Sequence, residues 1–336
     1  MSQLPTVRSG SAAIGPRARL YDADGRDREI DLEDARLERL GDRQLLWIDL
    51  EGREQAHLER IARMVGLESD LVARLADSPV RADLTSYPDH IHLILVAMEP
   101  ESEDAIDRLV RRPIDVVAGR NWVVTVHDGH VRAFTRFDAT TEGETTLGAL
   151  DAAGFLAAIA DEVLADYLEL VEAMEREIDA LDERALRHPR GSEVLVGIVG
   201  LRRRIGFIRR SLAPHRIAFA ALARPEMELH DELGKPWPAL TDRLERALEA
   251  VENLRDLLLG TFDIHMGRAA QDTNEVMKVL TLLSAVLLPA VVLAGVMGMN
   301  FQVSFFDDPG NFWIVIAVMV ILATGILLGA RRRGWL

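Results

Sequence analysis

The sequence contains no cysteine, and this absence excludes two kinds of structural support. Without thiols the chain can form neither a disulfide framework nor a thiolate metal site, so a closed structural zinc site of the usual kind is not expected. Residues 1–5 also lack the apolar core of a signal peptide. We therefore expect the large N-terminal part of the chain to stay on the side of the membrane where it is synthesised.

Sequence patterns of the common enzyme classes are missing as well. The chain has no glycine-rich phosphate loop and no HExxH pattern, and no nucleophile–base arrangement stands out. Its formal net charge of −15 opposes binding to nucleic acid, because phosphates need a positive surface. We predict that the protein is not an enzyme, uses no cofactor and has no nucleic-acid partner. Its acidic surface either concentrates cations or simply aids solubility.

Apolar residues are concentrated at the C-terminal end of the chain. Residues 279–306 and 309–330 contain no charged side chain, and each stretch is long enough to cross the hydrocarbon core, which takes about 20 residues. We predict two transmembrane helices, over residues 279–300 and 312–330. The connection at 301–311 is so short that the two spans must form a hairpin with both ends on one side of the membrane.

The charges that flank the hairpin predict its orientation. Lys278 precedes the first span, and the second is followed by a basic tail at residues 331–336 that contains Arg331, Arg332 and Arg333. The connecting loop carries only Asp307 and Asp308. The positive-inside rule then places both termini in the cytoplasm and the loop in the periplasm of a bacterial inner membrane. The basic residues form a belt that contacts membrane lipid headgroups or surrounds an inner mouth.

One stripe of residues recurs at spacings of three and four along the first span and holds its only polar side chains before Asn300. This stripe consists of Asn274, Met277, Thr281, Ser284, Leu288, Val291, Gly295 and Gly298. Polar groups in lipid face either a partner helix or a water-filled path, and the spacing alone leaves both interpretations open. Two spans cannot enclose a path by themselves, so a pore would require several copies of the chain.

The part before the membrane segments divides into three regions. After a flexible tail at 1–17, strands mixed with helices over 18–145 predict an α/β domain, with a helix at 54–75 and strands at 90–99, 114–117 and 121–127. Residues 146–238 predict a helical region, including one helix over 192–224. A helical pattern then runs from 239 to 300 without a turn signal, about 90 Å at 1.5 Å per residue. Its first part, 239–278, is a predicted stalk helix that packs beside copies of itself.

Several motifs resemble the CorA family of divalent metal ion transporters, including its ZntB-like branch. Gly298-Met299-Asn300-Phe301 ends the first of two C-terminal spans, and residues 274–281 resemble the family's junction of stalk and pore. Pro289 lies where the family also places a proline. The resemblance extends upstream to Leu212-Ala213-Pro214-His215-Arg216, Trp47-Ile48-Asp49-Leu50 and Val124-Thr125-Val126-His127.

The resemblance implies a homopentameric funnel, in which an α+β cytoplasmic domain is followed by a long stalk helix and two C-terminal transmembrane helices. The first span would line the pore, and Gly298, Met299 and Asn300 would form its selective outer mouth. Asn300 and Asn274 would contact a hydrated cation through its water, whereas Leu288 and Met277 would form apolar constrictions. The implied pore-lining residues are Asn274, Met277, Leu280, Thr281, Ser284, Leu288, Val291 and Gly295.

The identity of the ion stays open between Mg²⁺, with Co²⁺ and Ni²⁺, and Zn²⁺. The loop after Asn300 lacks the Met-Pro-Glu of the common Mg²⁺-transporting members, and Asp307 and Asp308 are candidates to supply its acidic function. Residues 209–224 look closer to the ZntB-like branch. The alternatives are therefore a zinc transporter driven by a proton gradient and a membrane scaffold or sensor that does not transport.

Further candidate sites lie outside the membrane. His265 is a candidate cation or proton site in the stalk. A possible regulatory divalent-cation site, or simply a solvated helix face paired with Arg243, Arg246 and Arg255, is formed by Asp242, Glu245, Glu249, Glu252 and Asp256. The basic run Arg202 to Arg204 is predicted to pair with the acidic helix that precedes it.

Overall fold

The computed structural model of the 336-residue chain describes residues 15–33, 37, 40–41, 43–77, 79–101, 108–141, 152–187, 192–223, 237–299 and 310–335. These residues form two compact units, one from Met1–Ala180 and Val196–Gly260 and the other from Leu181–Leu195 and Thr261–Leu336. Most of the predicted tail at 1–17 and of the predicted loop at 301–311 lies outside the described residues, as do Asn300, Asp307 and Asp308.

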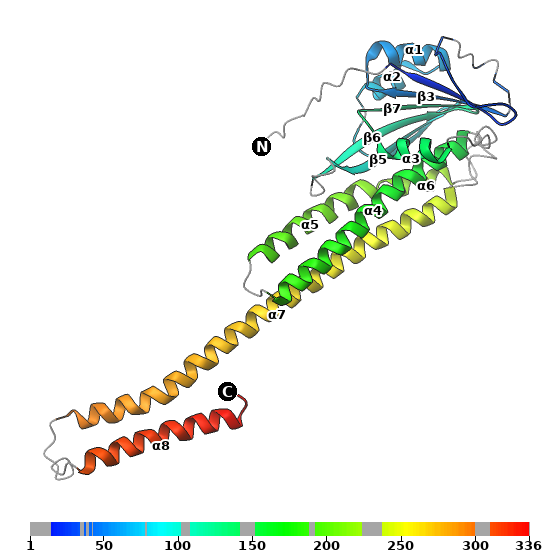
Figure 1. Cartoon of the computed structure of the whole chain (residues 1–336). Coiled ribbons are helices and arrows are strands. Elements are labelled where there is room, and N and C mark those ends of the chain that lie inside the picture. Colours follow the sequence, from blue (N-terminus) through cyan, green and yellow to red (C-terminus); the bar gives the residue numbers. More distant parts are fainter. Residues whose placement is uncertain are drawn as a thin grey trace. The chain divides into compact units, whose positions relative to one another are not determined.

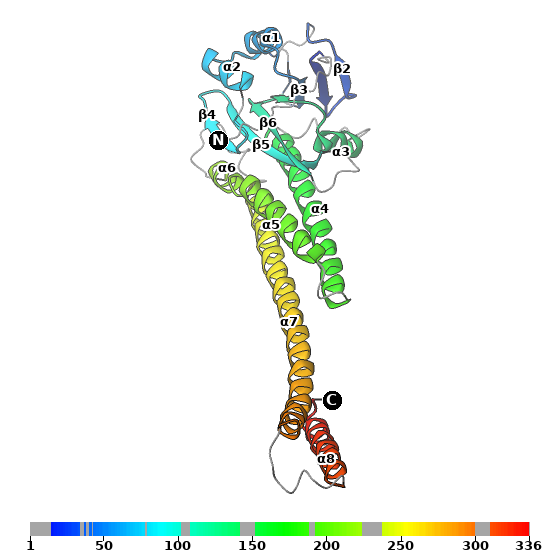
Figure 2. The same ribbon diagram turned by 90° about the vertical axis from the view of Figure 1, so that its left-hand side faces the viewer.

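A seven-stranded sheet organises the first unit (Figures 1 and 2). Its spatial order is β2-β1-β3-β7-β6-β5-β4, and of its neighbouring pairs only β3 and β7 run parallel. The strands are β1 (Arg17–Asp22), β2 (Arg28–Ile30), β3 (Gln44–Glu51), β4 (Asp83–Ser86), β5 (Ile91–Pro100), β6 (Leu109–Ala118) and β7 (Trp122–His127). The predicted strands at 90–99 and 121–127 are confirmed, and the one at 114–117 is the buried end of the longer β6.

Helices cover both faces of the sheet, which explains the nearly continuous apolar runs of β5 and β7. Alternate residues of β3 point to opposite faces. Leu46 and Ile48 belong to the core under α1 (Gln55–Val65) and α2 (Ser69–Ala76). On the other face Trp47 lies 5.8 Å from Phe134 of α3 (Arg132–Thr141) and 5.2 Å from Phe155 of α4 (Ala152–Arg187), measured between ring centroids.

The single helix predicted at 54–75 is wrong, because the chain forms two helices there. Gly66 adopts a left-handed conformation with φ +79°, and its amide donates to Ala62 O at 2.8 Å. This arrangement ends α1, since a left-handed residue cannot continue a right-handed helix and glycine adopts it without steric cost. The helix α2 then begins at Ser69 in a new direction.

The single helix predicted at 192–224 is also wrong. Residues Ala213 and Pro214 separate α5 (Ser192–Leu212) from α6 (His215–Leu222), because proline has no amide to continue the hydrogen-bond ladder. The break lets buried His215 reach β5, where its Nε2 accepts a hydrogen bond from Val96 N at 3.1 Å. The Tyr167 hydroxyl donates to Val96 O at 2.8 Å.

These two side chains complete an edge of the sheet. Strand β4 pairs with β5 only as far as Ile94, so the backbone of Val96 has no strand partner on that side. Burial lowers the pKa of His215 to about 4, which keeps the imidazole neutral. Its Nδ1 then donates to Leu212 O at 3.0 Å, and its Nε2 is free to accept from Val96.

The second unit contains the apolar part of a long helix that begins in the first unit, together with a second apolar helix. The helix α7 runs without interruption from Trp237 to Met297 and includes Pro289, so the continuous helix predicted from stalk to first span is confirmed up to Met297. Gly298 and Met299 form a turn after it. The helix α8 (Gly310–Arg332) runs back alongside the last part of α7 (Figure 1). Both helices are long and apolar enough to cross a membrane.

Candidate functional site

The apolar part of α7 has one half-buried side and one exposed side. The half-buried residues recur at spacings of three and four and are Leu282, Val286, Pro289, Ala290, Leu293 and Met297. The less exposed residues of α8 also recur at spacings of three and four and are Asn311, Val315, Met319, Ala323, Ile326 and Ala330. We infer that these two sides face each other, as in an antiparallel helix pair.

The predicted stripe lies on the side of α7 that α8 leaves uncovered. Thr281, Ser284, Leu288, Val291, Gly295 and Gly298 are all exposed, as are Asn274, Met277 and Leu280 further down the helix. The exposed fraction reaches 65% for Leu288 and 67% for Val291. The structure thus places the predicted residues of α7 along one face that α8 does not cover.

The polar members of the stripe differ in their hydrogen bonds. The Thr281 hydroxyl donates to Met277 O at 2.7 Å, which satisfies the group within its own helix. Within the described residues, the side chains of Asn274 and Ser284 make no hydrogen bond. Asn274 therefore offers an unpaired amide one turn before the apolar segment, where it can bind water or a hydrated cation.

The Gly298-Met299 turn closes the outer end of α7. The Gly298 amide donates to the carbonyls of Ala294 at 3.0 Å and Gly295 at 3.2 Å, and the Met299 amide donates to Val296 O at 3.2 Å. A methyl group added at Gly298 would come no closer than 3.5 Å to another atom, so packing within one chain does not require glycine here. Any requirement for glycine at this position would have to arise outside the single chain.

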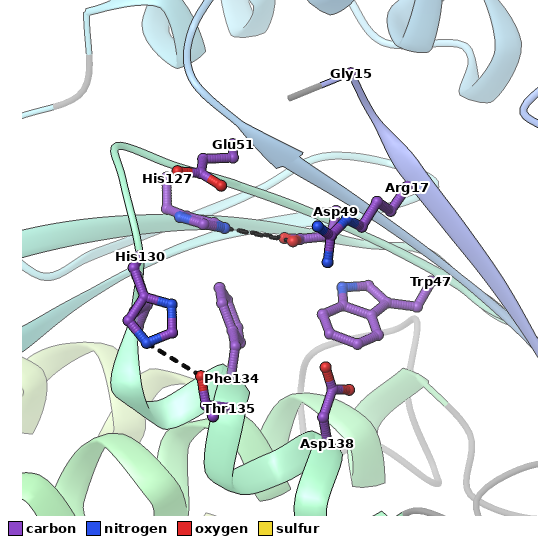
Figure 3. A pocket seen from close by; sticks show the side chains of 11 residues that line it. Gly15, Arg17, Trp47, Asp49, Glu51, His127, His130, Phe134, Thr135 and Asp138 are labelled. Atoms are coloured by element: carbon purple, nitrogen blue, oxygen red, sulfur yellow. Dashed lines mark hydrogen bonds and ion pairs between the residues drawn. The ribbon is translucent and has the colours of Figure 1, made fainter. Parts of the chain in front are cut away.

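A polar pocket of about 170 Å³ lies in the first unit, between the sheet and α3 (Figure 3). His127 at the end of β7 approaches Asp49 of β3 with an Nε2–Oδ1 distance of 3.2 Å, and its Nδ1 lies 2.7 Å from Gly129 O. Burial lowers the pKa of His127, but the hydrogen bond and charge of Asp49 outweigh that effect and the net pKa is raised. The Thr125 hydroxyl also donates to Asp49, at 2.5 Å.

The groups of this pocket largely satisfy one another. Asp138 accepts from Arg19 at 2.9 Å, and His130 lies within 3.2 Å of the Thr135 hydroxyl. Among the residues that the structure describes, no three His, Asp or Glu side chains are placed to hold one metal ion. The pocket therefore shows a pH-sensitive ion pair rather than a preformed metal centre. Both segments carry motifs of the sequence, but the sequence does not reveal this pair, because nothing in it indicates that β3 and β7 are neighbours.

Two of the predicted acidic residues of α7 pair with arginines of other helices. Glu245 accepts from Arg216 of α6 at 2.6 Å, and Glu252 accepts from Arg209 of α5 at 3.3 Å. Neither of these two acids pairs with the arginines predicted from the same helix, namely Arg243, Arg246 and Arg255. Helix packing instead brings arginines of α5 and α6 close to them. The remaining predicted acids, Asp242, Glu249 and Asp256, are exposed.

Two further predictions concern Arg204 and His265. Arg204 binds Glu177 of α4 at 2.6 Å, which confirms the predicted pairing with the preceding helix for this residue of the run. Arg202 and Arg203 are exposed. His265 is 5% exposed, and its Nδ1 has no hydrogen-bond partner among the described residues. Its role as a cation or proton site stays a prediction.

Comparison with known proteins gives one family over most of the chain. Residues 42–332 match the family described as CorA-like Mg²⁺ transporter protein. The cobalt/magnesium transport protein CorA of Methanocaldococcus jannaschii is 23% identical over 92% of this chain and 94% of its own length. The CorA protein of Thermotoga maritima is 29% identical, over 54% of this chain and 52% of its own length, so that match spans about half of each protein. A zinc transport protein ZntB of Pectobacterium carotovorum is 21% identical over 86% of this chain and 88% of its own length.

Solved structures share the fold. The complete CorA magnesium transporter of Methanocaldococcus jannaschii matches with a TM-score of 0.78 at 21% identity, over 96% of this chain and 99% of that chain. The full-length CmaX protein matches with a TM-score of 0.70 at 22% identity, over 95% of this chain and 97% of that chain. These similarities extend over the α/β unit, the long helix and the two apolar helices.

Proposed function

This chain belongs to the CorA family of divalent-cation transporters, and from that premise we propose that five copies form a pore for hydrated cations across the bacterial inner membrane. The α/β unit lies in the cytoplasm, and both termini are on that side. The first apolar helix of each copy lines the pore, and the second faces lipid. The transported ion is Mg²⁺, with Co²⁺ and Ni²⁺ as further substrates.

The uncovered stripe of α7 is the observation that carries this proposal. If the chain stayed a monomer in lipid, Ser284 and Thr281 would face hydrocarbon along with the glycines of the stripe. A ring of five α7 helices turns this side toward a shared axis and leaves α8 on the outside. Polar residues within a membrane face a bundle interior or a water-filled path, and a ring supplies both.

The chemistry of the stripe suits a hydrated ion. Magnesium keeps its water shell, so neutral amide and carbonyl oxygens hold it through water and still release it. Asn300, with the carbonyl of Gly298, forms the outer ring, and Asn274 forms a ring at the inner end. Met277 and Leu288 give apolar constrictions that close by excluding water. Asp307 and Asp308 concentrate cations at the outer mouth.

Zinc is the second candidate ion, because relatives over most of the chain include proteins named for zinc transport. In that case a proton gradient would drive uptake. A scaffold or sensor without ion flux would keep the same helices but would not need a continuous stripe.

Uptake into proteoliposomes tests the proposal. The purified chain should take up Mg²⁺ down a gradient, and Asn300→Ala and Asn274→Ala should each reduce the rate. Asn253→Ala is a matched control, because Asn253 is an exposed asparagine of the same helix outside the apolar part. Absence of flux for Mg²⁺, Zn²⁺, Co²⁺ and Ni²⁺ under every gradient would refute transport. Competition between Mg²⁺ and Zn²⁺ at fixed voltage and pH then identifies the ion.

A further inference from the structure

The pocket beside α3 holds more charged groups than its own contacts neutralise (Figure 3). It has a volume of about 170 Å³ and lies within the first unit. Asp49 accepts a hydrogen bond from Thr125 and pairs with His127, and Asp138 pairs with Arg19. When these paired groups are set aside, one cation and one anion of the lining remain.

The two remaining groups are the guanidinium of Arg17 and the carboxylate of Glu51. Both line the pocket, where Arg17 is exposed and Glu51 is half-buried. Neither side chain forms a hydrogen bond or an ion pair within the described part of the chain. Opposite charges that share a pocket without pairing are free to bind the two ends of one ligand that carries both signs.

The register of the strands separates these two groups by a short distance. Arg17 of β1 is the pairing partner of Asp49 of β3, and Glu51 lies two positions further along β3 on the same face. Diagonal neighbours of this kind are about 7–8 Å apart. The same register continued by two residues would bring Gly15 opposite Glu51, and a β-carbon added to Gly15 would meet no other atom within 4 Å. The space beside Glu51 is therefore open to a small molecule.

Apolar side chains and the size of the pocket limit the ligand further. Trp47, Val131 and Phe134 belong to the lining, and all three are buried. A volume of about 170 Å³ corresponds to about six water molecules at about 30 Å³ each. The pocket therefore suits a molecule of roughly six non-hydrogen atoms that carries a small apolar group besides its two charges.

We propose that this pocket binds a small zwitterion, namely an α-amino acid with a short side chain such as alanine. The guanidinium of Arg17 donates two parallel hydrogen bonds to the carboxylate of the ligand, and Glu51 accepts from its ammonium group. The methyl group packs against Val131 and Phe134. Each charged end of the ligand thus meets the opposite charge, and binding adds no net charge to the pocket.

Ligands of a single sign fit this lining less well. A divalent cation would meet the guanidinium of Arg17, and no three His, Asp or Glu side chains of the described residues are placed to hold one ion. An inorganic anion such as phosphate would meet three carboxylates, those of Asp49, Glu51 and Asp138. A zwitterion avoids both conflicts because it presents each sign to its own partner.

The proposal goes beyond ion transport and does not depend on it. Every residue that lines the pocket lies between positions 15 and 138 of the first unit, and none belongs to the stripe of α7. Binding can therefore be measured in the absence of any ion gradient, so that failure of amino-acid binding and failure of transport remain distinguishable.

The test is equilibrium dialysis of the full-length protein in detergent against radiolabelled L-alanine, which should bind saturably. Unlabelled analogues then compete with the label. Lactate has a hydroxyl in place of the ammonium group, and alaninamide has an amide in place of the carboxylate. Each analogue should compete at least ten-fold less well than alanine, because each loses one contact between opposite charges. This comparison uses the parent protein, so it does not depend on the folding of any variant.

Variants then assign the site. Arg17→Gln and Glu51→Gln should each weaken alanine binding at least ten-fold, and Arg17→Lys should retain part of the affinity. Arg28→Gln is the matched control, because Arg28 is an exposed cation of the neighbouring strand β2 that does not line the pocket. It should change the affinity less than two-fold, and size-exclusion profiles matching the parent protein verify that each variant is folded.

Several results would overturn the proposal. They are an absence of saturable alanine binding, equal competition by alanine, lactate and alaninamide, and equal losses in the Arg17→Gln and Arg28→Gln variants. Displacement of labelled alanine by millimolar phosphate or Mg²⁺ at constant ionic strength would also overturn it, because the pocket would then bind a simple ion.

Discussion

Replacement of Arg53 by methionine should open the first unit locally, because Arg53 neutralises a fully buried carboxylate. Its Nη1 lies 2.8 Å from Asp115 Oδ2, and the two side chains are 11% and 0% exposed. The same guanidinium donates to Leu75 O at 2.5 Å and to Asp128 at 3.0 Å. It therefore joins β6, the end of α2 and the turn after β7.

The expected cost follows from the burial of the pair. Loss of one partner leaves Asp115 with only His92, at 2.7 Å, and a buried charge that loses its counter-ion costs about 3–5 kcal/mol. Methionine retains part of the apolar volume, so the loss reflects charge and hydrogen bonds more than packing. By contrast, the pair of Arg43 with Asp24 is more than half exposed on both sides and should contribute about 0–1 kcal/mol.

Hydrogen–deuterium exchange of the full-length protein measures this difference without assuming a single unfolding transition. Amides of β5 and β6 should exchange about 10² to 4 × 10³ times faster in Arg53→Met, since each factor of ten corresponds to about 1.4 kcal/mol. Arg43→Met should change them by less than about five-fold. Addition of Asp115→Asn to Arg53→Met should recover part of the protection, because it removes the unpaired charge. Unchanged exchange in Arg53→Met, or equal effects of the two arginine variants, would refute the reasoning.

Three further predictions concern titration and the membrane stripe. Burial raises the pKa of the Asp166 carboxyl to about 6, although the charge of Arg136 opposes this shift. The folded state therefore binds this proton more tightly than the unfolded state, so the stability should fall as the pH rises from about 4 to about 6. Asp166→Asn should make the protection against hydrogen exchange independent of pH over that window, and an unaltered pH dependence would contradict the assignment. The pKa of His127 is also raised, here because the imidazolium pairs with Asp49, so the stabilising effect is complete below about pH 6.5 and is lost as the pH rises through the folded-state pKa. Asp49→Asn should remove this dependence from the exchange of β7 amides, and its persistence would show that another group titrates. Ser284→Leu should reduce the rate of cation uptake at least ten-fold relative to the parent protein. Val320→Leu, at an exposed position of α8, is the control and should change the rate less than two-fold. Equal rates in the two variants would argue against a stripe that lines the pore.

Local pattern made the membrane hairpin predictable. The two apolar runs, the cations that flank them and the stripe on α7 are all properties of contiguous sequence, so composition and helical period were sufficient. The long helix was predictable for the same reason, because Gly260 and Gly267 are isolated within a continuous helical pattern. The helix also continues past Pro289. Helix boundaries at Gly66 and Pro214 were missed, since apolar spacing continues across both residues.

Long-range contacts were beyond sequence reasoning. Asp49 and His127 occupy neighbouring strands that are 78 positions apart in the chain, and only the parallel pairing of β3 with β7 brings them together. His215 was noted only as part of a family motif, yet its imidazole completes the sheet edge at Val96. Neither contact leaves a periodic signal, because each depends on how elements distant in sequence pack.

The sequence by itself determined that this chain has a charged cytoplasmic part, a long helix and a two-span hairpin of the CorA family. These conclusions depend on hydrophobicity and motif spacing, which are local. The tertiary structure decided which side of α7 is left open, because that depends on where α8 packs. It also decided that His127 lies beside Asp49, since only the parallel pairing of β3 with β7 brings the two side chains together.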